Sequence, residues 1–161
     1  MNQIQEQAPI QDYVHLRGSL RIAMLDPDGK IIEERLVKNT VALTGRAWIL
    51  GQLETTNQVT SQTISYMAIG SVTVAPVTGN TGLGNEVTRL AIGTFNTVNL
   101  TANPPSFDSV TSFATNLANT QLAEVGLFNS SAVGTLIARA TFASFTKATS
   151  NTLSITYTLS D

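Results

Sequence analysis

The chain contains no cysteine and a single histidine, His15. Without cysteine it can form neither disulfides nor thiolate metal sites. His15 lies in a polar N-terminal segment, away from the apolar runs of the chain, so we expect neither a Ser-His-Asp triad nor a histidine-based metal site within one chain.

Charge is also scarce. Charged residues make up 12% of the sequence, and nine Lys and Arg residues stand against 11 Asp and Glu for a net charge of -2. So few cations argue against nucleic-acid binding, which relies on clustered Lys and Arg over phosphates. No run of apolar residues is long enough to span a bilayer, and residues 1–7 lack the pattern of a secretory signal. We therefore expect no membrane segment and no export.

Signals for catalysis are weak. Residues 75–86 (APVTGNTGLGNE) are glycine-rich, but no Gly-Lys-Ser/Thr follows them and no helix is predicted after them, so a phosphate-binding loop is not expected. The carboxylates that a hydrolase would need are scattered, and their proximity cannot be established: Glu33, Glu34, Glu54, Glu86, Asp108 and Glu124. The sequence predicts no enzyme activity and no cofactor or metal.

What the chain does contain indicates an all-β protein. Thr, Ser and Asn supply nearly a third of its residues, and these types favour strands and turns. Residues 152–159 alternate strictly between apolar and polar side chains, as in a half-buried strand. Two further apolar runs, 121–128 and 135–145, are joined by turn-forming residues. Together the three segments predict an antiparallel meander.

The N-terminal half predicts a hairpin and one helix. Strands over 16–25 and 30–38 flank Asp26-Pro27-Asp28-Gly29, in which Pro presets the turn and Gly accepts left-handed geometry. Apolar residues at three- and four-residue spacing then predict a short helix over 41–54. Gly45 and Gly51 weaken that helix, so we expect packing of Trp48 to stabilise it.

The middle of the chain predicts further strands in one domain. Residues 64–74 are expected to form a strand with a glycine bulge, followed by the loop 75–86 and strands over 90–100 and 106–117. With no linker-like stretch, residues 16–161 are expected to form a single β-sandwich domain. Residues 1–15 are expected to be an arm that either frays or orders against a neighbouring subunit.

Two sets of side chains stand out as structural candidates. The first comprises seven aromatic residues expected to anchor the core: Trp48, Tyr66, Phe107, Phe113, Phe128, Phe142 and Tyr157. The second comprises isolated charges in an otherwise neutral region: Glu86, Arg89, Glu124, Arg139 and Lys147. These charges are either solvated rim positions or a set of internal or inter-subunit ion pairs, and alternation leaves open which face of 121–128 is buried.

Four phrases in a fixed order carry a family resemblance. They are residues 66–70 (YMAIG), 81–89 (TGLGNEVTR), 123–128 (AEVGLF) and 134–139 (GTLIAR). Their order resembles small virion proteins of tailed bacteriophages, and it is also similar to the attachment domain of phage tail-collar fibre proteins. The resemblance covers about residues 40–159.

The resemblance implies a structural protein of the virion, assembled in the host cytoplasm. Because neither a shaft nor a receptor-binding tip follows residue 159, it points first to a head decoration, or cement, protein. Such a protein would be an antiparallel jelly-roll-like sandwich that forms a homotrimer on the major capsid protein. The alternative is a tail or collar component that attaches fibres. A carbohydrate-binding module would need exposed aromatics or ordered carboxylates in its loops, and residues 75–85 and 129–134 offer neither, except for Phe128 at the edge.

Overall fold

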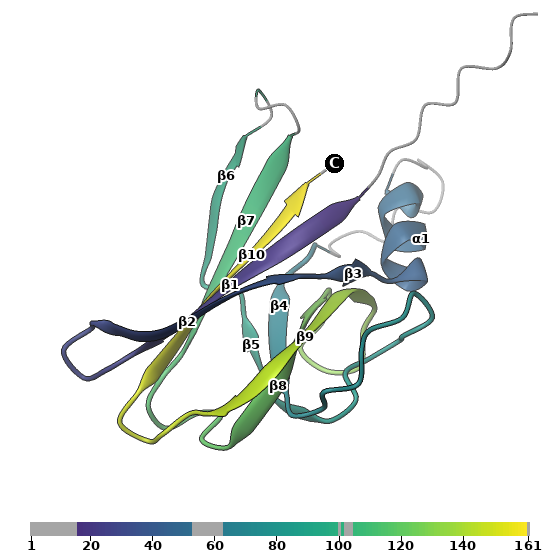
Figure 1. The fold of residues 1–161 in the computed structure, drawn as a ribbon. Helices are drawn as coiled ribbons and strands as arrows, with labels where there is room; N and C mark the ends of the chain where they lie inside the picture. The colour runs from purple at the N-terminus through teal and green to yellow at the C-terminus, as the bar shows by residue number, and fades with distance from the viewer. Residues whose placement is uncertain (1–15, 53–62, 100, 102–104, 161) are drawn as a thin grey trace, which may run out of the picture.

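The computed structural model describes residues 16–52, 63–99, 101 and 105–160. Two antiparallel five-stranded sheets lie face to face, with one short helix at one end (Figure 1). The all-β sandwich expected from the composition is confirmed, and its jelly-roll character stays a prediction. The ten strands are β1 Arg17–Leu25, β2 Ile31–Lys38, β3 Thr40–Val41, β4 Tyr66–Gly70, β5 Glu86–Ala91, β6 Thr94–Asn99, β7 Ser106–Phe113, β8 Gln121–Phe128, β9 Leu136–Thr146 and β10 Thr152–Ser160.

Sheet A has the strand order β2-β1-β10-β7-β6. The expected N-terminal hairpin is present, and Gly29 closes its turn with a φ of 78°, which a glycine adopts without strain. Strand β10 lies at the centre of the sheet and pairs with β1 from Arg17↔Ser160 to Leu25↔Thr152. The expected meander is therefore wrong at its last step, because β10 leaves β9 and joins the other sheet.

Sheet B has the strand order β3-β9-β8-β4-β5. The β8–β9 hairpin expected from residues 121–145 is present, with register shifts near Leu122 and Phe128. Strand β4 is shorter than the expected 64–74, and its glycine, Gly70, lies at its end and not at its middle. The segment expected as one strand over 90–100 is divided: β5 ends in sheet B at Ala91, and β6 begins in sheet A at Thr94.

The main core lies between the sheets. Alternation in β10 places Leu153, Ile155, Tyr157 and Leu159 inward, each at most 4% exposed, as the sequence pattern predicts. They meet apolar residues of sheet B such as Met67, Ile69, Val125 and Leu127. A second, smaller apolar cluster lies on the other face of sheet B and comprises Ala42, Ala68, Phe128 and Leu136. Sheet B is therefore buried on both faces along part of its length.

Helix α1 spans Leu43–Gly51, shorter than the expected 41–54. Its apolar stripe is only partly buried, since Leu43 and Leu50 are 57% and 66% exposed. The buried residue of the helix is Gly45, where a Cβ atom would lie only 2.6 Å from the Cα atom of Ile137 in β9. Gly45 thus lowers helix propensity, as expected, but it also permits the helix to approach the sheet closely.

Candidate functional site

Strand β8 lies at the centre of the site because both of its faces are covered. Val125 and Leu127 point into the main core, whereas Glu124 and Phe128 lie on the outer face of sheet B. On that outer face, one cross-strand row runs Arg89–Ala68–Gly126–Arg139 across β5, β4, β8 and β9. Two arginines therefore flank two small residues beneath the loops 71–85 and 129–135.

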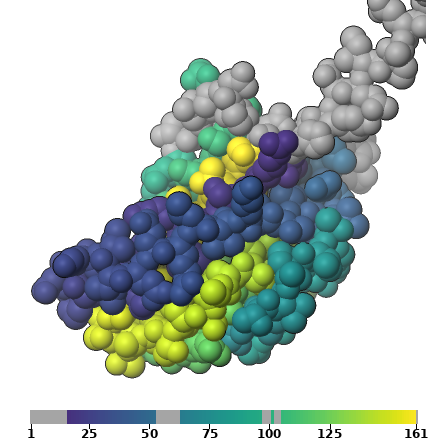
Figure 2. Space-filling model, in the orientation of Figure 1, coloured from purple at the N-terminus to yellow at the C-terminus, as the bar shows by residue number. Residues whose placement is uncertain are grey.

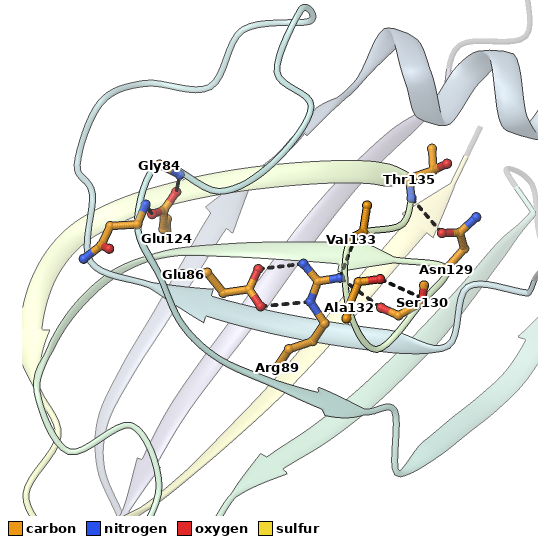
Figure 3. A network of polar contacts seen from close by, with 10 residues as sticks. Gly84, Glu86, Arg89, Glu124, Asn129, Ser130, Ala132, Val133 and Thr135 are labelled. Atoms are coloured by element: carbon orange, nitrogen blue, oxygen red, sulfur yellow. Dashed lines mark hydrogen bonds and ion pairs between the residues drawn. The ribbon is translucent and has the colours of Figure 1, made fainter.

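Glu124 joins loop 71–85 to the sheet. Its side chain is fully buried, and it accepts hydrogen bonds from the backbone N–H groups of Val72, Gly84 and Asn85 at 3.2, 2.9 and 2.9 Å. Figure 3 shows the carboxylate pointing toward Gly84. Burial raises the pKa of Glu124, but these N–H groups and the Arg139 guanidinium lower it, and the net pKa lies below the ordinary glutamate value.

Arg139 supplies the opposite charge. Its Nε and Nη2 atoms lie 2.9 and 2.7 Å from Oε2 of Glu124, and both side chains are almost completely buried. The remaining guanidinium nitrogen, Nη1, donates to Oδ1 of Asn80 at 3.0 Å. Asn80 lies within loop 71–85, so the ion pair binds that loop at its middle as well as at its two ends. Ionised partners make these hydrogen bonds stronger than neutral ones.

Small residues make room for this arrangement. A Cβ atom at Gly70 would lie 2.6 Å from Oε1 of Glu124, and one at Gly126 would lie 2.9 Å from Leu83 of the loop. Real Cβ atoms do not tolerate such distances, so a side chain at either position would displace the carboxylate or lift the loop. Both glycines belong to the phrases YMAIG and AEVGLF.

Arg89 holds the second loop. Its guanidinium pairs with Glu86 (Nε–Oε1 2.9 Å and Nη2–Oε2 2.6 Å) and donates from Nη1 to the carbonyl oxygens of Ser130 and Val133 at 2.9 and 3.0 Å (Figure 3). Its Cζ atom also lies 3.6 Å from the centroid of the Phe128 ring. Val133 has a φ of 57°, a left-handed conformation that is strained for a β-branched residue, and Arg89 binds its carbonyl.

Lys147 is separate from these two pairs. It follows β9 at the far end of the strand, is only 1% exposed, and donates from Nζ to Oδ1 of Asn119 at 2.7 Å and to the carbonyl of Thr115 at 3.4 Å. Burial lowers the pKa of its amine. Of the five isolated charges, four thus form two ion pairs in the structure, while Lys147 has only uncharged oxygen partners among the described residues.

Comparisons with protein-family models, with curated proteins and with solved structures find no match. The function of the site is therefore argued from its geometry.

The geometry of Glu124 is that of a loop-binding carboxylate. Glu124 is inaccessible to a substrate, and both of its oxygens already accept hydrogen bonds from the loop and from Arg139. A general base needs a free lone pair within reach of a substrate proton. In the described part of the chain, no three His, Cys, Asp or Glu residues gather as metal ligands, and no helix is long and apolar enough to cross a membrane.

The seven expected core anchors divide into two groups. Phe113, Phe128, Phe142 and Tyr157 are buried, at most 8% exposed. Trp48, Tyr66 and Phe107 are only partly buried and pack against the edges of the two clusters. Trp48 and Phe107 line an apolar hollow of about 300 Å³ at the end of the sandwich near α1, so this end is less completely filled than the sequence suggests.

Sequence reasoning missed most partners of the site. The backbone N–H groups that bind Glu124 have no residue-type signature, since nearly every residue carries one. The sequence shows Asn80 only as part of a polar loop. The sequence predicts a bulge at Gly70, and a register shift is present there, although at the end of β4. The clearance that Gly70 and Gly126 provide depends on which strands pair, which the sequence does not show.

Proposed function

We propose that the chain is a structural protein of a tailed-phage virion, a head decoration protein that binds between capsomers as a homotrimer. The observation that carries the proposal is the role of the phrases that resemble phage virion proteins. Of their charged residues, Arg89, Glu124 and Arg139 bind loops to one sheet, and Glu86 pairs with Arg89 on the same strand. These phrases therefore supply residues that hold loops to a sheet, which supports a structural role.

The surface opposite these loops suits a packing role. The outward residues of β10, Thr152, Ser154, Thr156, Thr158 and Ser160, form a neutral polar ridge along the centre of sheet A. On its flanks Thr158 donates to Asp108 at 2.6 Å, and Arg21 pairs with Glu34. The centre of this face is uncharged and does not repel neighbouring subunits, and many weak contacts on a lattice add through multivalency.

The test is the number of copies in purified virions, measured by quantitative mass spectrometry against the major capsid protein. A decoration protein should be present in a fixed ratio to the capsid protein, and particle reconstruction should place it on the outer capsid lattice. The same phrases are also similar to the attachment domain of collar fibres, and that candidate predicts only a few copies, located at the tail or collar. Absence from virions would overturn both assignments.

A further inference from the structure

A cationic hollow lies where β1 begins and β2 ends. It has a volume of about 530 Å³, and the segments around it are residues 16–19, 38–41, Arg46 of α1 and Ser160. Three cations line it: Arg17, Lys38 and Arg46. The whole chain has only nine Lys and Arg residues, so a third of its positive side chains gather at this one place.

These three cations have no ion-pair partner among the described residues, unlike four of the six other cations. Within the described ranges, four arginines form ion pairs with glutamates, namely Arg21, Arg35, Arg89 and Arg139. Lys147 is buried against uncharged oxygens, and Lys30 lies at the tip of the β1–β2 hairpin. No carboxylate among the described residues pairs with the three cations around the hollow, which leaves their charge available to a ligand.

Asn39, which also lines the hollow, turns its amide toward Tyr157 of sheet A. Its Nδ2 atom lies 2.7 Å from the hydroxyl oxygen of Tyr157, while its Oδ1 atom is buried without a partner. Burial raises the pKa of Tyr157, so its phenol is neutral and needs an acceptor. Turning the amide over lets Oδ1 accept from the phenol and moves Nδ2 to the unpartnered position. Because that unpartnered position is buried, the amide fixes the end of β2 beside the hollow and leaves the binding of a ligand to the three cations.

The opposite end of the same hairpin carries a net negative charge, from Asp26 and Asp28 against Lys30. Asp26 and Asp28 lie in the turn between β1 and β2, and this turn projects beyond the rest of the sandwich (Figure 1). Oδ1 of Asp26 accepts the backbone N–H groups of Asp28 and Lys30 at 3.0 and 2.9 Å, which fixes the turn. Asp28 is exposed, and no ion pair or hydrogen bond of its carboxylate is recorded among the described residues.

We propose that the cationic hollow binds the acidic hairpin tip of a second copy of this chain, with the Asp28 carboxylate placed among Arg17, Lys38 and Arg46. The proposal rests on the proposed self-assembly of the chain and names its contact. Because tip and hollow are different surfaces, a contact made in one direction is heterologous, and repeating it gives a ring where the rotation between copies closes and an open filament where it does not. The proposed trimer requires the closed form. In the space-filling view, β2, which connects the two ends, runs along an open face of the molecule (Figure 2).

The experiment is a charge swap read by sedimentation velocity of the full chain at low ionic strength. We expect the unmodified chain to form a closed oligomer, and Asp28→Lys or Arg46→Glu to raise its dissociation constant roughly tenfold each. Combining the two substitutions should restore most of the lost affinity. Added salt should weaken assembly, since the attraction is between exposed charges. Circular dichroism of each variant verifies that the fold is intact.

Lys30→Glu is the matched control, because it changes the net charge by the same amount as Arg46→Glu. It makes the tip more acidic, so the proposal predicts tighter assembly, whereas an effect of net charge alone predicts weaker assembly for both variants. A monomeric wild-type chain, or an oligomer that the single reversals leave unchanged, overturns the proposal. If the single reversals leave the oligomer unchanged, the proposed contact is wrong, but the proposed virion role is unaffected. If the charge swap succeeds but the protein is absent from virions, the virion role is wrong, but the contact is retained.

Discussion

Removing the Glu124 carboxylate is the most direct test of the loop-binding site. Glu124→Ala leaves the guanidinium of Arg139, 3% exposed, without its counter-charge, and leaves the N–H groups of Val72, Gly84 and Asn85 without an acceptor. Breaking a buried ion pair by removing one partner costs about 3 to 5 kcal/mol. Since a domain is stable by only about 5 to 15 kcal/mol, the variant should lose a large share of its free energy of unfolding.

The assay is urea denaturation followed by circular dichroism, with Glu86→Ala as the matched control. Glu86 is also an acid paired with an arginine, but its side chain is 33% exposed, and Arg89 keeps its carbonyl partners and the Phe128 ring. A partly exposed pair of this kind is worth about 1 kcal/mol or less. Limited proteolysis should also cleave loop 71–85 faster in Glu124→Ala than in the control.

The acid limb of the stability curve gives a second readout of Glu124. Its pKa is lower in the folded state than in the unfolded chain, so its contribution is present above the unfolded glutamate value of about 4.3. That contribution is lost as the pH falls through the lower folded pKa. The stability difference between wild type and Glu124→Gln should therefore shrink as the solution is acidified. Two results together would refute the reasoning. The first is a Glu124→Ala variant as stable as the Glu86→Ala control, and the second is a stability difference between wild type and Glu124→Gln that does not change with pH.

Two further predictions concern Gly45 and Lys147. Gly45→Ala should destabilise the fold by about 1 to 3 kcal/mol, because its new Cβ atom would collide with the backbone of Ile137, whereas Gly51→Ala, which meets no atom within 4 Å, should stabilise by up to about 1 kcal/mol. Equal effects of the two alanines in thermal denaturation would contradict this account. Burial lowers the pKa of Lys147 in the folded state, so the unfolded chain binds more protons between the two pKa values and the stability due to this group rises with pH there. Lys147→Met should remove that alkaline rise in stability, and a curve unchanged by the substitution would show that the amine is not desolvated.

Local features of the fold could be predicted from the sequence. Asp26-Pro27-Asp28-Gly29 predicts the first hairpin because turn geometry depends on adjacent residues, and alternation in residues 152–159 predicts the buried face of β10. Which sheet β10 joins depends on its pairing with β1, more than a hundred positions away. Alternation within one segment shows its buried face but not its partner strand. The division of 90–100 between two sheets was missed for the same reason.

The site was predictable only in part. The scarcity of charge singles out Glu124 and Arg139, because an isolated charge in an apolar strand needs a partner. The sequence could not show which face of β8 is buried, because both faces are. Sheet A covers one face, and loop 71–85 covers the other. The sequence shows that loop as neutral and glycine-rich, and its contribution comes from its backbone.

The central position of β10 also determines when the protein can fold during synthesis. Strands β1 and β7 have β10 as their common neighbour, and the pairing Arg17↔Ser160 joins the two extremes of the described chain. Until residue 160 has left the ribosome, the β1–β2 and β6–β7 hairpins remain two separate pairs, each with an open edge. Such non-local pairing folds slowly and exposes strand edges to other chains. Nascent chains stalled before residue 152 should therefore lack a complete sheet A, and their open edges would be binding sites for chaperones.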